Sequence, residues 1–377
     1  MSMDSDNLNL VDDLNTQEFT INMGPYHPST HGVFRAVLTL DGEVIVKEEN
    51  VLGYLHRGMD KIAETRTYSQ FVPYTARLDY LASALNNMGY VQTVEKLMGI
   101  EVPERAEYLR VIIAELQRIA SHYLMLGSTT NDVNAVTGFL YYMHDREKVL
   151  DLLEMVTGAR LTSNYMRIGG VIDDLPEEFF PKVKEFLAYL PGRLEMMETL
   201  ILGNEIFQER MKNVGVITAQ MALDYGVTGP NLRAAGVRFD LRKVAPYSAY
   251  GKIDFEVPVL KNGDAFDRYQ IRLMEIKQSL RIIEQAVQQL PEGPIMAKVP
   301  KLIKPPAGEV FHKMEGARGI LGFHLVSDGG PKPYRLHIHG PSFVNIGIMP
   351  AIAPGMLLQD FLAAFATIDV DMGEVDR

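Results

Sequence analysis

The segment ERAEYLRVIIAELQRIASHYLML, residues 104–126, decides the fold class of the middle of this 377-residue chain. Its apolar side chains recur every three or four positions, which is the spacing of an amphipathic helix. Pro103 precedes the segment and Gly127 follows it. The sequence therefore predicts a helix that begins after the proline and ends at the glycine.

The segments on either side of this helix have the same period. They predict further helices at residues 77–98, 131–156, 176–190, 194–211 and 267–290. The connections between most of them are short, which favours a helical bundle at the centre of the molecule.

Strand signals lie towards both ends of the chain. Asp41-Gly42 predicts a tight turn between strands at 33–40 and 44–51, and Asp328-Gly329-Gly330 predicts another between 320–326 and 334–339. A short helix near Leu357 leads into an acidic tail.

We therefore predict an α+β fold in a single domain, residues 1–377, without repeats or low-complexity segments. Its expected parts are a β-rich N-terminal part (1–58), a helical bundle (59–212) and a part with a loop region, a helix, a hairpin and the C-terminal tail (213–377).

Composition excludes several classes of function. The chain has no cysteine, so its own thiolates cannot hold an iron–sulfur cluster, and sulfur-ligated zinc and disulfides are also excluded. The net charge of −11 argues against a nucleic-acid partner. No apolar run approaches the roughly 20 residues of a membrane helix, so we expect a cytosol-side protein that reaches a membrane only through partners.

The loop GPYHPSTHG, residues 24–32, contains the most informative polar residues, His27 and His31. Pro28 disfavours a helix across them, so the spacing of four does not place both on one face. Hydrogen-bond donation by these histidines, turn formation without function, and metal binding all remain open from the residues alone.

Other polar residues have ordinary explanations. His337 and His339 alternate with apolar residues, which is typical of one solvated or interfacial strand face. Asp132 near the start of a helix complements the helix dipole. The sequence predicts ordinary helix-surface positions for Asp60, Glu64, Asp79 and Tyr80. An alternative is a soluble metal hydrolase that uses His27, His31, His337 and His339.

Several motifs resemble one family over essentially the whole chain: the D subunits of NADH–quinone oxidoreductase, which are respiratory complex I subunits related to [NiFe]-hydrogenase large subunits. The motifs that support this resemblance are GPYHPSTHGVFR (24–35), GYLHRGMDKIAETRTY (53–68), VPYTARLDYL (72–81), RVIIAELQRIASHYLMLG (110–127), MRIGGVIDDLPEEF (166–179), LRAAGVRFDLRK (232–243), SDGGPKPYR (327–335), PSFVN (341–345) and MGEVDR (372–377).

The resemblance implies a hydrogenase-large-subunit-like fold and a quinone-binding role in a proton-translocating enzyme. It implies that His31 and Tyr80 bind the quinone headgroup and that Asp132 is the charge partner of His31, with His27 as a further quinone-binding candidate. A quinone carbonyl only accepts hydrogen bonds, so imidazole N–H and phenol O–H donors suit it. The hydrogenase cysteines are absent, because the C-terminal segment reads DVDMGE at 369–374. A nickel–iron site is thereby excluded.

The resemblance also implies partners and a location. The terminal iron–sulfur cluster would belong to a neighbouring small subunit, because this chain binds neither cluster nor metal, and NADH would be used by the whole complex rather than by this chain, which is not catalytic alone. Further expected partners are the thirty-kilodalton-type peripheral subunit and the quinone-channel membrane subunit. The expected place is the cytoplasmic face of the inner membrane. An equivalent subunit of a ferredoxin-fed complex and a scaffold without chemistry remain alternatives.

Overall fold

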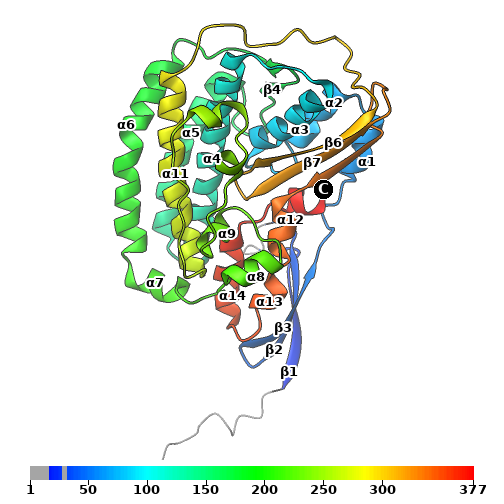
Figure 1. Cartoon of the computed structure of the whole chain (residues 1–377). Coiled ribbons are helices and arrows are strands. Elements are labelled where there is room, and N and C mark those ends of the chain that lie inside the picture. The colour runs from blue at the N-terminus through cyan, green and yellow to red at the C-terminus, as the bar shows by residue number, and fades with distance from the viewer. Residues whose placement is uncertain (1–16, 28–31) are drawn as a thin grey trace, which may run out of the picture.

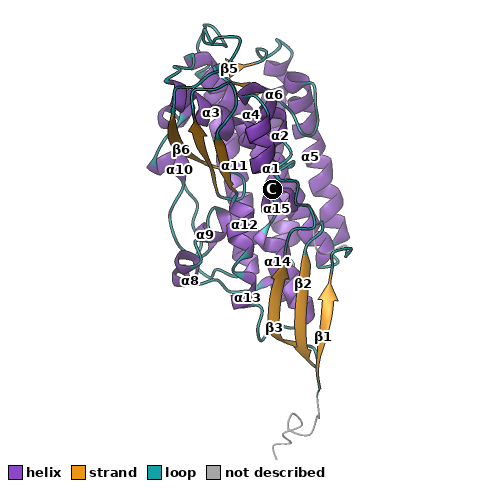
Figure 2. Ribbon diagram, turned by 90° about the vertical axis from the view of Figure 1, so that its right-hand side faces the viewer, coloured by secondary structure: helices purple, strands orange, loops and turns teal. Residues whose placement is uncertain are grey.

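The computed structural model describes residues 17–27 and 32–377 as a helical body from which a three-stranded sheet extends at one end (Figures 1 and 2). The α+β composition predicted from the sequence is confirmed. The described elements are, in chain order, β1 (Glu18–Met23), β2 (Arg35–Asp41), β3 (Val44–Val51), α1 (Met59–Thr65), α2 (Tyr68–Thr75), α3 (Ser83–Met98), α4 (Glu104–Asp132), α5 (Val136–Thr157), β4 (Met166–Arg167), β5 (Gly170–Val171), α6 (Phe179–Met197), the π-helical turn η2 (Glu198–Leu202), α7 (Glu205–Met211), α8 (Ala219–Asp224), α9 (Pro230–Ala234), α10 (Leu241–Val244), the 3₁₀ turn η3 (Ser248–Lys252), α11 (Ala265–Gln288), β6 (Gly308–Glu315), β7 (Ile320–Ser327), β8 (Arg335–His339), α12 (Pro341–Ile346), α13 (Met349–Ile352), α14 (Leu358–Ile368) and α15 (Met372–Asp376).

Helix α4 is the axis of the bundle, with α5 and α11 packed along it. The predicted stop at Gly127 is wrong, because α4 continues to Asp132. A Cβ on Gly127 would lie 2.8 Å from the Cε of Met143 in α5. The missing side chain at this position thus lets α5 approach closely, and the glycine serves helix packing rather than helix termination.

Helix α3 begins at Ser83 rather than at the expected Arg77. Before it, Asp79 accepts hydrogen bonds from the backbone N–H groups of Leu81 and Ala82, both at 3.1 Å. An aspartate that bonds the backbone two and three residues ahead favours a turn over helix interior. Residues 77–82 therefore form a turn that leads into α3.

The helical region 176–211 is divided differently from the prediction. Helix α6 passes through Pro191 and ends at Met197, and the π-helical turn η2 then leads towards α7. The expected break between 190 and 194 is therefore wrong.

The structure contains two three-stranded antiparallel sheets, with strand orders β1-β2-β3 and β6-β7-β8. Asp41 pairs with Val44, which confirms the predicted hairpin turn. The second predicted hairpin, β7–β8, is also confirmed, and β6 adds a strand that the sequence patterns did not indicate. Gly89 of α3 faces this sheet, since a Cβ there would lie 2.9 Å from the ring of Phe323.

The apolar core has two clusters of buried side chains. The larger fills the bundle and the face of β6–β8 that packs on α3, and the smaller joins β1–β3 to α12, α13 and α14. Helix α14 contributes to both, with Ala363 and Ala364 in the first and Phe361 and Phe365 in the second. The acidic segment that follows α14 is buried, forms the short helix α15, and contributes Val370, Met372 and Val375 to the smaller cluster.

Candidate functional site

Two of the residues that the sequence singled out, Tyr80 and Asp132, line one cavity of about 250 Å³. Tyr80 lies in the turn before α3 and Asp132 is the last residue of α4. The expected place of Asp132 near a helix start is therefore wrong. The described residues that line this cavity are Tyr80, Leu81, Leu124, Met125, Ser128, Asn131, Asp132, Phe139, Arg318, Asp369, Val370 and Asp371.

The cavity has an apolar side and a charged side. Leu124, Met125 and Phe139 come from α4 and α5, whereas Arg318 lies in the turn between β6 and β7. Binding sites for organic ligands usually combine apolar walls with a few placed polar groups. Since such sites for drug-sized ligands measure roughly 300–1,000 Å³, this smaller volume suits one ring rather than a long chain.

The turn that presents Tyr80 is held by its neighbour Asp79. One carboxylate oxygen of Asp79 accepts the turn's N–H groups, and the other accepts a hydrogen bond from Nη1 of Arg318 at 2.5 Å. Asp79 is only 3% exposed, so its expected place on a helix surface is wrong. Burial raises its pKa, and the charge of Arg318 opposes that rise.

Arg318 is the cation of the site and is itself buried. Besides Asp79, its Nη2 lies 3.2 Å from Asp369 and its Nη1 lies 3.3 Å from the hydroxyl of Ser121. Burial alone would lower the pKa of Arg318, but Asp369 and Asp79 raise it above its ordinary value. A buried cation between carboxylates fixes the turns that contribute them, because each charge needs its partner.

Asp371 is a further buried carboxyl group of the site and, unlike Asp79, is among the residues that line the cavity. It is 2% exposed, and its Oδ1 accepts the backbone N–H of Gly373 at 2.7 Å. Within the described residues its Oδ2 has no hydrogen-bond partner. Burial, followed by the charge of Asp79, raises the pKa of Asp371 well above its usual range.

The phenol of Tyr80 is kept protonated by these surroundings. The charge of Asp371 is the largest cause, and burial adds to it, so that the pKa of Tyr80 rises to about 12. At neutral pH the group is therefore a hydrogen-bond donor to whatever occupies the cavity.

Of the two histidines of the N-terminal loop, only His27 lies within the described residues. His31 lies outside the described residues, and His27 is exposed and is not among the described residues that line the cavity. Gly32, the residue after His31 in sequence, lies beside the C-terminal segment: a Cβ on it would be 3.5 Å from Cγ of Met372. Phe34 then stacks on Phe365 of α14 at 4.7 Å between ring centroids. The chain just after the loop is thus anchored close to Asp371.

The residues of the β8 face lie elsewhere, against α1. Nδ1 of His337 is 3.2 Å from Asp60, and Arg335 bonds Glu64 at 3.2 Å. Asp60 and Glu64 are therefore half-buried contacts to a strand rather than ordinary helix-surface residues. No group of three or more His, Asp or Glu residues that could hold a metal ion is found where the structure describes the chain.

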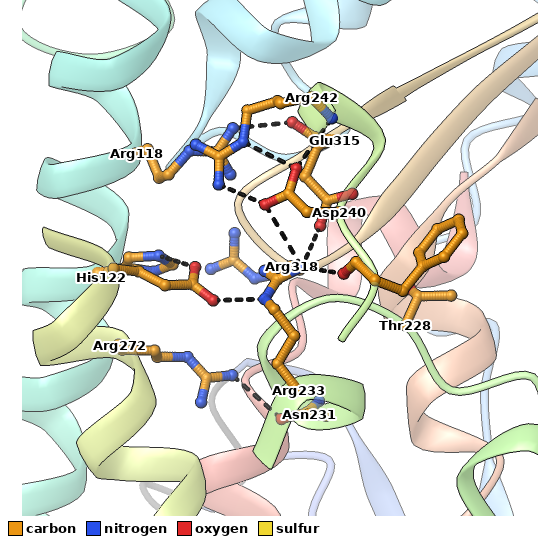
Figure 3. A network of polar contacts seen from close by, with 12 residues as sticks. Arg118, His122, Thr228, Asn231, Arg233, Asp240, Arg242, Arg272, Glu315 and Arg318 are labelled. Atoms are coloured by element: carbon orange, nitrogen blue, oxygen red, sulfur yellow. Dashed lines mark hydrogen bonds and ion pairs between the residues drawn. The ribbon is translucent and has the colours of Figure 1, made fainter. Parts of the chain in front are cut away.

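Beside the cavity, a larger set of charged side chains is buried along α4 (Figure 3). Glu275 accepts one hydrogen bond from Nε of Arg233 at 2.8 Å and lies 3.1 Å from Nε2 of His122. Arg233 also bonds Glu315, which leads into the turn that holds Arg318. Charges this deep are costly unless fully paired, so this network ties the strands β6–β7 to the bundle in one arrangement.

Sequence reasoning missed Arg318, Asp369 and Asp371 as cavity residues. One signal was available for Arg318, which lies in Gly316-Ala317-Arg318-Gly319. Gly319 has φ of +138°, and a Cβ there would meet the Thr228 hydroxyl at 2.1 Å. An arginine next to a glycine in a tight turn indicates that the backbone conformation of the turn fixes the position of the charged side chain.

A larger groove of about 910 Å³ runs between α6 and α11 and has another character. Aliphatic side chains such as Val183 and Leu280 line it together with Lys277 and Glu284. None of the residues singled out from the sequence lies there. Within the described part of the chain, no helix combines the length and apolar character that crossing a bilayer requires.

Comparison with known proteins gives a consistent result. The profile of the family described as "Respiratory-chain NADH dehydrogenase, 49 Kd subunit" matches residues 132–307 and 299–377. Several D subunits of NADH-quinone oxidoreductase are similar to this chain over nearly their full length. The one from Clostridium beijerinckii is 60% identical over 97% of this chain and 99% of its own. Those from Desulforamulus reducens and Geobacillus kaustophilus are 56% and 51% identical, each over 96% of this chain and 99% of their own.

Proposed function

The chain belongs to the family of the 49-kDa subunit of respiratory-chain NADH dehydrogenase, and from this membership we propose that it forms the quinone-reducing site of a proton-translocating NADH–quinone oxidoreductase. The observation that supports the site most strongly is the shared cavity of Tyr80 and Asp132. The two residues lie on separate elements, and the family resemblance implies that Tyr80 binds the quinone headgroup and that Asp132 is the charge partner of His31, the other headgroup ligand.

The chemistry follows from the donors. Reduction places negative charge on the quinone oxygens, and a fixed O–H or N–H donor stabilises this charge more than it stabilises the neutral carbonyl. Tyr80 gives a hydrogen bond and then a proton to one oxygen, and His31 does the same at the other. Histidine titrates near neutral pH, which suits a proton donor. Asp132 is the charge partner that favours the imidazolium form of His31.

The electrons come from outside the chain. With no cysteine, it depends on an iron–sulfur cluster of a neighbouring small subunit. The proposal further includes a thirty-kilodalton-type peripheral subunit, a membrane subunit through which quinone enters, and a peripheral place on the cytoplasmic face of the membrane. A ferredoxin-fed complex is the second candidate for the donor, and co-purification with an NADH-oxidising flavin subunit would exclude it.

Photoaffinity labelling tests the position of the site. We expect a quinone bearing a photoreactive group on its ring to label peptides containing residues 80–81 and 124–139 in the assembled complex, with excess unmodified quinone suppressing the labelling. Labelling confined to the groove of α6 and α11, with none at the cavity, would contradict the proposal. That groove serves as the internal control, since it is larger and more apolar in character.

Replacing the carboxylate of Asp132 with the neutral amide of asparagine tests the role of its charge. In Asp132→Asn the side chain keeps its size but loses its charge, so we expect slower quinone reduction and fewer protons translocated per quinone reduced, measured with a pH-sensitive dye in closed vesicles. Asp151→Asn, an exposed position on α5, is the control. If Asp132→Asn pumped with the unaltered proton-to-quinone ratio, the proposed link between this charge and translocation would be wrong.

A further inference from the structure

Asp371 has a feature that the binding of quinone by Tyr80 and His31 leaves unexplained. One of its oxygens is buried at the cavity without a hydrogen-bond partner among the described residues, while the other is held by the N–H of Gly373. Leaving a buried polar atom without a hydrogen-bond partner is energetically costly. An oxygen kept in this state beside a cavity points to a function at the cavity.

Among the described residues, several elements bring charged or titratable groups close to Asp371. Asp79 and Tyr80 lie in the turn before α3, Arg318 in the β6–β7 turn, and Glu374 on the same short helix. From the segment before α1, Arg57 bonds the carbonyl oxygen of Gly373 at 2.9 Å. Asp132 and Asp369 are two further acids that line the same cavity as Asp371.

We propose that Asp371 is a proton carrier of this cavity, whose carboxylic acid replaces the proton that Tyr80 gives to reduced quinone. This inference rests on the proposed function. The steps balance as follows: two electrons from the neighbouring cluster reduce the quinone, the O–H bond of Tyr80 breaks as a quinone O–H bond forms, and the O–H bond of Asp371 breaks as that of Tyr80 is restored. The aspartate left behind takes a proton from water, and the second quinone oxygen is protonated separately.

The direction of transfer follows from the acidities. Burial and the charge of Asp79 raise the pKa of Asp371. Asp371 therefore keeps its proton at pH values at which an ordinary carboxyl group is ionised. A phenol has an ordinary pKa of about 10, so the phenolate of Tyr80 is a much stronger base than a carboxylate even while Asp371 carries its proton and no charge. Proton transfer from Asp371 to that phenolate is therefore downhill. Arg318, one of the charges that favour ionised Asp371, stabilises the product of the transfer.

The test uses the pH profile of the assembled complex. In the parent complex we expect kcat for quinone reduction to fall as the pH rises through the pKa of Asp371, because only the protonated acid restores Tyr80. Asp371→Asn has no proton to give, so its kcat should be lower by at least about 10-fold and should lose this alkaline decline. The KM for quinone should change little, and reduction of ferricyanide upstream of the quinone should remain at the parent rate.

Two further variants control for structure. Asp371→Glu keeps the acid and should retain most of the activity, with the decline shifted along the pH axis. Glu48→Gln removes a buried acid of β3 that is not among the described residues lining the cavity and is not a cause of the raised pKa of Asp371, so it should keep both the rate and the decline. Should Asp371→Asn fail to assemble, an unshifted decline in Asp371→Glu would overturn the inference.

The results for these variants distinguish the proton-carrier role of Asp371 from the proposed quinone-binding function. If Tyr80→Phe is impaired while Asp371→Asn has the parent rate and profile, the proton-carrier role is wrong and the quinone site stands. An equal loss at every pH in Asp371→Asn, with the decline retained, indicates a structural role and also overturns the inference. If Tyr80→Phe reduces quinone normally, the assignment of the phenol is wrong and the relay through it is wrong as well.

Discussion

Replacing Tyr80 by phenylalanine is expected to lower kcat for quinone reduction by about 100-fold, the range in which a positioned proton donor acts. The substitution removes a single oxygen from a half-buried side chain and leaves the turn around Asp79 intact. Because the phenol is protonated at neutral pH, the loss should persist across that range rather than appear at one pH. Steady-state turnover of a short-chain quinone by the assembled complex measures it.

A matched control is Tyr74→Phe, a half-buried tyrosine of α2 that is not among the residues lining the cavity. We expect it to turn over quinone at the parent rate. His31→Ala should show a loss similar to that of Tyr80→Phe, with a rise in KM for quinone. Unchanged kcat and KM in both Tyr80→Phe and His31→Ala would remove the assignment of the site.

The second large effect concerns stability. Arg318→Met should destabilise the chain by about 3–5 kcal/mol, because it leaves Asp79 buried without its cation and removes one of the two arginines that pair with Asp369. The matched control is Arg160→Met, which removes an arginine that also contacts several carboxylates, but on the surface. That change should cost less than about 1 kcal/mol. Resistance of the complex-bound chain to urea compares the two.

The pH dependence of this defect has a definite sign. Without Arg318 the pKa of Asp79 rises further, because that charge is the largest opposing influence on it. The variant then binds more protons when folded than when unfolded, so its deficit relative to the parent should shrink as the pH falls. A deficit that is constant from neutral to mildly acidic pH would show that lost packing, rather than unpaired charge, is the cause.

The parts of the fold set by local pattern could be predicted. The period of residues 267–290 predicts α11, which spans Ala265–Gln288, and Asp41-Gly42 predicts the hairpin of β2 and β3. Both depend on short-range physics: apolar spacing in one, turn geometry in the other. Membership of the family confirms the predicted hydrogenase-large-subunit-like α+β fold class as well.

Where the prediction failed, contacts distant in sequence decided the structure. Gly127 looks like a stop but is a contact point for Met143. Asp79 looks like a surface residue but pairs with Arg318, 239 positions away. Such pairings leave no periodic signal, so burial of a charge cannot be anticipated from its immediate neighbours.

The same limit explains what was found and what was missed at the cavity. Tyr80 and Asp132 were identified because motifs around them resemble a family, whereas their residue types alone suggested only helix surface and dipole. Arg318 was missed because it lies outside the motifs of the resemblance. Asp371 was missed because segment 369–374 was used only to exclude a nickel–iron site. The role of His31 stays a prediction from the sequence, since the residue lies outside the described part of the chain.

The burial of α15 has a consequence for the order in which the protein matures. Asp376 accepts the backbone N–H groups of Gly53 and Leu55 at 2.8 and 2.7 Å, so the last helix is bonded to a segment made near the beginning of synthesis. Contacts between such distant segments form late, because closing a long loop is entropically unfavourable. Residues 369–371, which form one wall of the cavity, therefore reach their final positions late in folding. A chain with a finished bundle but with α15 not yet docked would still lack the complete cavity.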